Sequence, residues 1–112
     1  MVKKSDWQTL DMPVENETFV YERPLSTENM ERIKEGYRPQ QMEDKWFMYY
    51  EDGKLDIHRS WSGICIYIVE ISEKKCVKAI VNRNPEQYRG TSIERDEMIL
   101  EELLNELIYR RI

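Results

Sequence analysis

The sequence predicts an α+β fold, an antiparallel meander of four or five strands with a C-terminal helix packed on one face and a short N-terminal helix. Two observations lead to this prediction. Residues 45–82 form strand-length runs rich in aromatic and other apolar side chains, and turn-forming residues separate the runs. Residues 91–111 instead repeat leucine and isoleucine at helical spacing. A chain of 112 residues suits one compact domain, so residues 1–112 are expected to share a single core.

The N-terminal third begins with a polar segment of no regular pattern. We expect residues 1–17 to form an irregular arm, with Trp7 and Leu10 as its anchors where it folds back on the domain. Residues 18–22 alternate as a short strand does, and Pro24 stops this strand because proline cannot donate to a ladder. The place of this strand in the sheet is left open by the sequence.

A short helix is predicted directly after this strand. Ser26 has the side chain of an N-cap, the helical stretch runs through Glu35, and Gly36 stands where a helix usually ends. We expect this helix and the arm to lie nearer the face of the sheet that the C-terminal helix leaves uncovered.

The register of the meander can be worked out from its turns. Asp52-Gly53 is typical of a type I′ hairpin, which places Phe47 opposite His58 and Met48 opposite Ile57. A two- or four-residue loop at Ser62-Gly63 would place Ser60 opposite Cys65 and His58 opposite Tyr67. A three-residue loop would move the later strands to opposite faces, so both arrangements stay open.

In the first of these registers the side chains separate onto two surfaces. The expected core surface carries Met48, Tyr50, Leu55, Ile57, Ile66, Ile68, Val77, Ala79 and Val81. The opposite surface mixes aromatic and polar groups, namely Phe47, Tyr49, Asp56, His58, Ser60, Cys65, Tyr67, Ile80 and Asn82.

The C-terminal helix is predicted to begin with a capping box, in which Thr91 is the N-cap and Glu94 lies three residues further on. The stripe that would cover the core consists of Leu100, Leu103, Leu104, Leu107 and Ile108. Arg110 and Arg111 at its end suit the negative end of the helix dipole.

Composition and motifs exclude several classes of function. The formal net charge of −5 argues against a partner that is a nucleic-acid polymer, and no apolar run is long enough to span a membrane. We therefore expect a cytoplasmic protein. Cys65 and Cys76 should lie roughly 20 Å apart along adjacent strands, too far for a disulfide. No zinc spacing or cofactor motif is present, so neither a metal site nor a cofactor is predicted.

The best candidate for a ligand site is the end of the sheet at the Ser62-Gly63 turn. A guanidinium, two indoles, a hydroxyl and the start of the last helix are expected to converge there on a small anionic or nucleotide-like ligand, or on a partner protein. The residues are Trp46, Arg59, Trp61, Ser62, Arg83, Arg89 and Thr91. We accordingly favour a small, non-catalytic binding or accessory module.

Two other functions stay open. One is a small enzyme, a hydrolase or transferase, in which His58 would act with Cys65 or Ser60 as nucleophile. In this alternative His58 needs access to solvent, whereas a histidine packed between Phe47 and Tyr67 would be structural. The other is an interaction or immunity-type protein that acts through its acidic surface.

Three segments, EDKWF, YYEDG and HRSWSG-CIY, contain the strand and turn residues discussed above. Together they resemble a group of small bacterial domains of uncharacterised function with a similar strand-turn-strand core. The resemblance covers about a third of the chain. It implies an association with ADP-ribose-processing modules, and no functional residues can be carried over from it.

Overall fold

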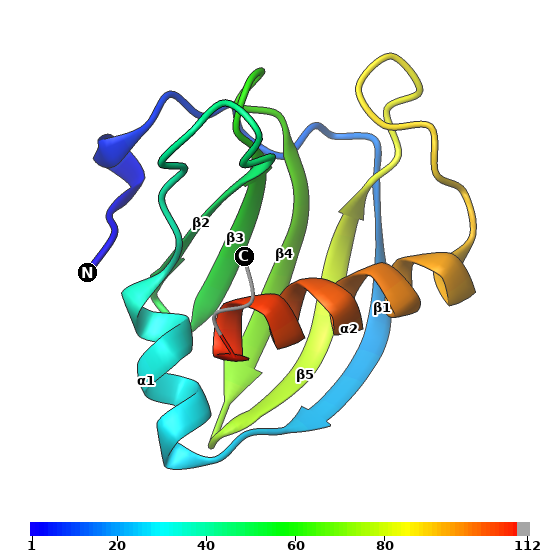
Figure 1. Ribbon diagram of the computed structural model, residues 1–112. Coiled ribbons are helices and arrows are strands. Elements are labelled where there is room, and N and C mark those ends of the chain that lie inside the picture. Colours follow the sequence, from blue (N-terminus) through cyan, green and yellow to red (C-terminus); the bar gives the residue numbers. More distant parts are fainter. Residues whose placement is uncertain (110–112) are drawn as a thin grey trace.

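The computed structural model describes residues 1–109, and a five-stranded antiparallel sheet carries both α-helices on one of its faces (Figure 1). The strand order is β1-β5-β4-β3-β2. The predicted α+β class is therefore confirmed. The elements are a 3-10 turn (Lys4–Asp6), β1 (Asn16–Pro24), α1 (Thr27–Glu35), β2 (Trp46–Glu51), β3 (Lys54–Arg59), β4 (Cys65–Ser72), β5 (Lys75–Asn82) and α2 (Ile93–Tyr109).

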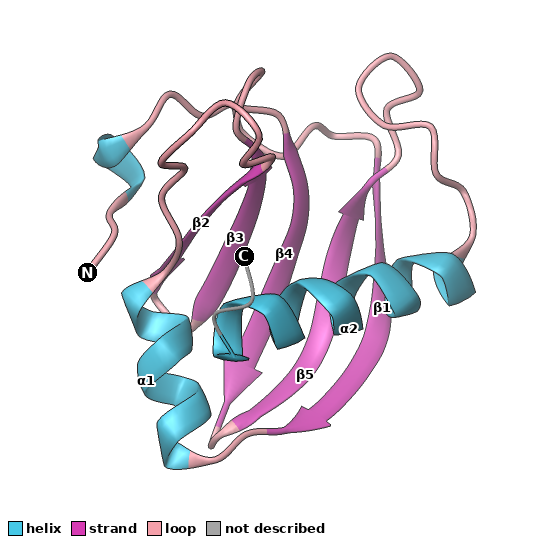
Figure 2. Cartoon of the chain, viewed as in Figure 1, coloured by secondary structure: helices cyan, strands magenta, loops and turns pink. Residues whose placement is uncertain are grey.

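The first strand, whose place the sequence left open, lies at the edge of the sheet beside β5. It pairs antiparallel with β5 from Asn16 opposite Asn82 to Pro24 opposite Lys75. It is longer than the predicted residues 18–22, but it does end at Pro24 as expected. The chain therefore crosses from one edge of the sheet at β1 to the other at β2, and α1 makes this crossing (Figure 2).

Helix α1 begins and ends where the sequence predicts. The Ser26 hydroxyl accepts a hydrogen bond from the Asn29 amide, and Gly36 has the positive φ of 71° that favours glycine. The prediction that α1 lies nearer the face opposite α2 is wrong. It packs against β2 and α2, because its buried Ile33 joins the same apolar core.

The β2–β3 hairpin has the predicted register at every pair, from Trp46 opposite Arg59 to Glu51 opposite Lys54. Asp52 and Gly53 have φ angles of 52° and 76°, as a type I′ turn requires. This is the segment where local turn chemistry alone fixes the pairing.

Of the two arrangements left open for β3 and β4, the first, with Ser60 opposite Cys65 and His58 opposite Tyr67, is wrong. His58 lies opposite Cys65, whereas Ile57 lies opposite Tyr67, so Ile66 is the extra residue of a β-bulge. Beyond the bulge the side chains of β4 change faces relative to our expectation. Tyr67 and Val69 therefore belong to the core, and Ile68, which was predicted there, is half-exposed.

The pairing of β4 with β5 contains a second register shift. Ile71 lies opposite Cys76 as the predicted turn at residues 73–74 requires, but Glu70 lies opposite Lys78, which leaves Val77 as the extra residue. This shift offsets the first one. Ala79 and Val81 are therefore buried as predicted, although their neighbours on β4 are different residues.

Helix α2 lies across the sheet and begins one residue later than predicted (Figure 1). The Ser92 hydroxyl, rather than that of Thr91, accepts a hydrogen bond from the Arg95 amide, so Ser92 is the N-cap. All five residues of the predicted apolar stripe are buried: Leu100, Leu103, Leu104, Leu107 and Ile108. Arg110 and Arg111 lie outside the described residues. Within residues 1–109, neither helix is long and apolar enough to cross a membrane.

The N-terminal arm folds back on the face opposite the helices, as expected. The Trp7 ring stacks on the Phe47 ring with their centroids 5.9 Å apart, which confirms Trp7 as an anchor. Leu10 holds the arm through its backbone, because its amide donates to the Gly63 carbonyl oxygen while half of its side chain stays exposed.

Candidate functional site

The arm, the loop before β2 and the β3–β4 turn enclose a surface hollow that we call the tip groove. It consists of two cavities of about 430 Å³ each, which share Trp7, Ser60 and Trp61. The first is further lined by Pro39, Gln40, Gln41, Met42 and Asp44. The second is further lined by Asp6, Gln8, Arg38, Ser62 and Gly63.

Hydrogen bonds hold the walls of the tip groove in place. The indole nitrogen of Trp7 donates to the Ser60 carbonyl oxygen at 2.7 Å, and that of Trp61 donates to the Met42 carbonyl oxygen at 3.1 Å. The Ser60 hydroxyl donates to the Asp44 carbonyl oxygen at 2.6 Å. The groove is therefore formed by the folded chain itself, and its aromatic rings have fixed positions.

A close backbone contact fixes the arm against the turn. A Cβ at Gly63 would lie 2.6 Å from the Gln8 carbonyl oxygen, and its φ of 76° also favours glycine. Only glycine therefore lets residues 7–10 approach this closely.

The tip groove is acidic rather than basic. The Gln40 amide and the Tyr37 hydroxyl both donate to the Asp44 carboxylate, and these bonds hold the pKa of Asp44 below its usual range. Asp44 is thus a carboxylate at neutral pH. Among the lining residues given above, Asp6 and Asp44 are acidic and Arg38 is the basic one.

Four of the seven residues predicted for the ligand site lie at the end of the sheet where β3 turns into β4. Trp61 and Ser62 line the tip groove. Arg59 and Trp46 instead contact each other, with the guanidinium 5.0 Å from the centre of the indole ring. This stacked pair is a cation–π contact, so the Arg59 guanidinium is already engaged by the Trp46 ring.

The other three predicted residues lie around the start of α2. Arg83 donates to the carboxylates of Glu17 and Asp96 and to the Gly90 carbonyl oxygen, so its guanidinium is already paired. Arg89 and Thr91 line a separate cavity of about 550 Å³ together with Tyr88, Gly90, Ser92, Arg95 and Ile99. The loop of residues 83–90 does leave the sheet at the same end as the β3–β4 turn, but it follows β5, and β4 separates β5 from β3 (Figure 1).

A buried polar cluster under the start of α2 was not predicted. Asp96 is fully buried, and its carboxylate accepts hydrogen bonds from the Tyr67 and Tyr88 hydroxyls and from the Arg83 guanidinium. Burial is the main cause that raises the pKa of Tyr67, so its hydroxyl keeps its proton. The one signal in the sequence was an aspartate whose helical position falls within the apolar stripe, four residues before Leu100.

The three residues of the catalytic alternative are all buried. His58 is 2% exposed, Cys65 is 1% exposed, and the Ser60 hydroxyl is engaged by the Asp44 carbonyl oxygen. Burial, together with the charges of Asp56 and Asp11, raises the pKa of the Cys65 thiol, so the nucleophilic thiolate is disfavoured. Both cysteines are free, as predicted.

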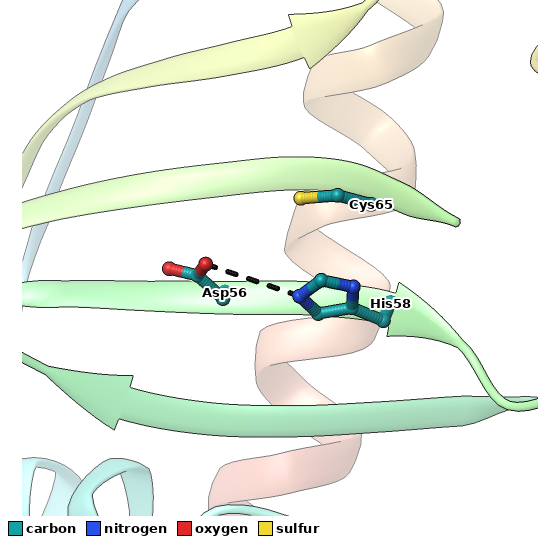
Figure 3. A group of neighbouring side chains, drawn as sticks. All are labelled: Asp56, His58 and Cys65. Carbon is teal, nitrogen blue, oxygen red and sulfur yellow. Dashed lines mark ion pairs between the residues drawn. The ribbon is translucent and has the colours of Figure 1, made fainter. Parts of the chain in front are cut away.

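Asp56, His58 and Cys65 are nevertheless the described residues that could hold a metal ion. Their side chains come from β3 and β4 and point toward one another on the face opposite α2 (Figure 3). One potential ligand atom from each lies within 4.8 Å of the others. Ligand spacing along the sequence does not reveal this group, because the bulge at Ile66 places Cys65 opposite His58 instead of opposite Ser60.

Comparison with known proteins found no match: no family model, no curated protein and no solved structure matches this chain. The resemblance of its EDKWF, YYEDG and HRSWSG-CIY segments to small bacterial domains therefore stays an expectation. The function has to be inferred from the geometry.

Proposed function

We propose that this protein is a non-catalytic binding module that holds a segment of a partner protein in the tip groove. The observation that carries the proposal is the pair Trp61 and Met42, which are 73% and 71% exposed and both line the groove, where the Trp61 indole donates to the Met42 carbonyl oxygen. Large exposed apolar side chains that are held rigidly are typical of protein contact surfaces.

The order of the groove supports this function. The Trp61 indole is fixed by its bond to the Met42 carbonyl oxygen, and the Trp7 indole by its bond to Ser60. A partner would therefore meet preformed walls and would not have to order them, which lowers the entropic cost of binding.

The charge of the groove favours one kind of partner segment. Two carboxylates, Asp6 and Asp44, line it together with the single guanidinium of Arg38. A phosphate or nucleotide would meet net negative charge there, whereas a lysine or arginine would be attracted. The proposed occupant is thus an extended segment with an apolar side chain flanked by a basic one.

The burial of His58 argues against the catalytic alternative. A substrate would have to reach His58 and Cys65, which lie beneath the arm and are almost fully covered. A general base must come within hydrogen-bonding reach of the proton that it removes. The acidic-surface alternative rests on the net charge of −5 alone.

A selection with random peptides tests the proposal. A phage-displayed library of random peptides is selected on the full chain, and the affinities of the enriched peptides are measured by fluorescence. We expect peptides with an apolar residue next to lysine or arginine, and we expect Trp61→Ala to weaken their binding at least tenfold. Val20→Ala is the matched control, because Val20 is 71% exposed on the distant strand β1.

Two results would overturn the proposal. One is the absence of any enriched sequence, or enriched peptides that bind Trp61→Ala as tightly as the native chain. The other is a rise in melting temperature with ATP or ADP-ribose that disappears in Arg38→Ala, because the groove would then hold a small anion.

A further inference from the structure

We propose that Asp56, His58 and Cys65 form a binding site for a zinc ion between β3 and β4, beneath the N-terminal arm. The three potential ligand atoms are a carboxylate oxygen, an imidazole nitrogen and a thiol sulfur, which are the donors that zinc prefers in proteins. The site is separate from the tip groove, and its existence does not depend on the proposed binding function.

The hydrogen bonds of His58 leave one nitrogen directed at the cluster. Its Nδ1 lies 2.9 Å from the Gly63 carbonyl oxygen, and because a carbonyl oxygen only accepts, Nδ1 carries the proton. In the neutral ring Nε2 therefore presents a lone pair. This atom is buried and has no hydrogen-bond partner, although buried polar side-chain atoms nearly always have one.

The Asp56 carboxylate does not satisfy this nitrogen. Its Oδ2 lies 3.9 Å from the His58 Nε2, along the dashed line in Figure 3, which is too far for a hydrogen bond. A metal ion would fit such a gap, because two ligands of a tetrahedral zinc ion are usually about 3.3–3.8 Å apart. The three ligand atoms lie within 4.8 Å of one another, so they would have to draw together by no more than about 1.5 Å to bind one ion.

The outer contacts are also those of a metal site. In a metal-binding histidine, the ring nitrogen that does not bind the metal commonly donates its hydrogen to a backbone carbonyl oxygen, as the His58 Nδ1 does to Gly63. Metal-binding carboxylates usually accept hydrogen bonds as well. The Tyr49 hydroxyl donates to Asp56 Oδ2 at 2.9 Å, and its ring stacks on that of His58. Both ligands are therefore held in position by their neighbours.

The electrostatics around Cys65 favour a cation. Asp56 and Asp11 both place negative charge near the Cys65 sulfur. When zinc binds, the Cys65 thiol would release its proton to solvent and coordinate the ion as a thiolate. The Asp56 carboxylate would neutralise the remaining positive charge. The Asp56 side chain is 18% exposed, so it is also the member of the cluster through which an ion reaches solvent.

Three protein ligands leave the fourth position of a tetrahedral ion open to solvent or to another ligand. The ion would also join β3 to β4 under the arm. The same Gly63 carbonyl oxygen that accepts from His58 accepts from the Leu10 amide, so the arm and the site share one backbone group. Zinc should therefore stabilise the arm as well as the sheet.

Metal titration of the untagged, metal-free protein tests this inference. We expect the native chain to take up one equivalent of zinc in competition with a chromogenic chelator and to melt at a higher temperature with zinc than without it. Cobalt as the probe should give tetrahedral visible bands and a near-ultraviolet band from thiolate to cobalt. Cys65→Ser and His58→Gln should each lower the zinc affinity at least tenfold.

Cys76→Ser is the matched control, because Cys76 is the second buried free thiol and belongs to the core on the other face. This variant should keep the full zinc uptake and the thiolate-to-cobalt band. The chain has two cysteines, so a band in Cys76→Ser can arise from Cys65 alone, even if Cys65→Ser does not fold. The inference is overturned if the native chain takes up no zinc, if Cys76→Ser loses the band, or if folded Cys65→Ser binds zinc with native affinity.

Discussion

Two buried polar clusters lie on opposite faces of the same sheet, and they differ in how well their groups are paired. On the helix face, the Asp96 carboxylate has three donors, and the Arg83 guanidinium that contacts it has further acceptors. On the arm face, His58 has one nitrogen bonded to Gly63 and one without a partner. The first cluster is complete within the protein, whereas the second lacks one contact.

This difference distinguishes polar groups that stabilise the fold from a polar group that is available to a ligand. A buried charge whose donors are all supplied by the protein ties elements together, and Asp96 joins α2 to β4 and to the loop between β5 and α2. A buried nitrogen without a partner costs free energy in folding, and the proposed zinc ion would supply the missing contact. Three substitutions, Asp96→Ala, Tyr67→Phe and His58→Leu, test whether the two clusters differ in this way, and two more, Asp44→Asn and Trp61→Ala, provide comparisons outside the clusters.

The largest effect is expected from Asp96→Ala. It leaves the Tyr67 and Tyr88 hydroxyls without their acceptor and removes one partner of the buried Arg83 pair, so the free energy of unfolding should fall by about 3–5 kcal/mol. Urea denaturation measures it. Glu97→Ala, at the exposed neighbouring position, should cost less than about 1 kcal/mol. A loss at Asp96 no larger than that control would mean that the cluster is not structural.

The next effect compares the two clusters directly. Tyr67→Phe removes one hydrogen bond to the Asp96 carboxylate and should cost about 1.5–3 kcal/mol. His58→Leu, in protein freed of metal, removes the unpaired nitrogen together with one hydrogen bond, so the two effects should nearly cancel, to within about 1 kcal/mol. Urea denaturation of both variants measures the two losses in the free energy of unfolding. If His58→Leu costs more than Tyr67→Phe, the contrast between the clusters is wrong.

A smaller effect on stability is expected from Asp44→Asn, and this effect should depend on pH. Asp44 belongs to neither of the two clusters. Its pKa is lowered in the folded protein by the Gln40 amide and the Tyr37 hydroxyl, so the carboxylate stabilises the fold above its unfolded pKa of about 3.9. This stabilisation is lost as the pH falls through the lower folded pKa. Asp44→Asn should therefore melt below the native chain at neutral pH, and the gap should close in acid.

Thermal melts from neutral pH down to below the ordinary pKa of aspartate measure this gap. Glu43→Gln is the control, because Glu43 is the exposed neighbour of Asp44. A gap for Asp44→Asn that stays constant in acid would show that the charge of the carboxylate does not support the loop.

The smallest effect on stability is expected outside both clusters. Trp61→Ala removes a side chain that is 73% exposed and should change the free energy of unfolding by no more than about 0.5 kcal/mol. The same variant is expected to lose peptide binding, so stability and function should separate at this residue. A large loss of stability would place Trp61 in the structural part of the molecule.

Much of the fold could be predicted from the sequence because it depends on local chemistry. The type I′ turn at Asp52-Gly53 fixes the whole β2–β3 register, and the Ser26 and Gly36 caps fix both ends of α1. Part of the candidate site was predictable for the same reason. Trp61 and Ser62 follow β3 directly and do line the tip groove, but Arg83 could not be recognised as already paired, because its partners Glu17 and Asp96 lie far away in the sequence.

The sequence by itself determined which segments are strands and helices, where the first hairpin turns and which side of α2 is buried. Only the tertiary structure decided the two bulges, the face that α1 covers and the meeting of His58 with Cys65. The physical reason is that a bulge changes little in the local backbone preference but reverses which face every later side chain occupies. Its position is selected by distant packing, such as that of the Tyr67 hydroxyl against Asp96, which no short stretch of sequence contains.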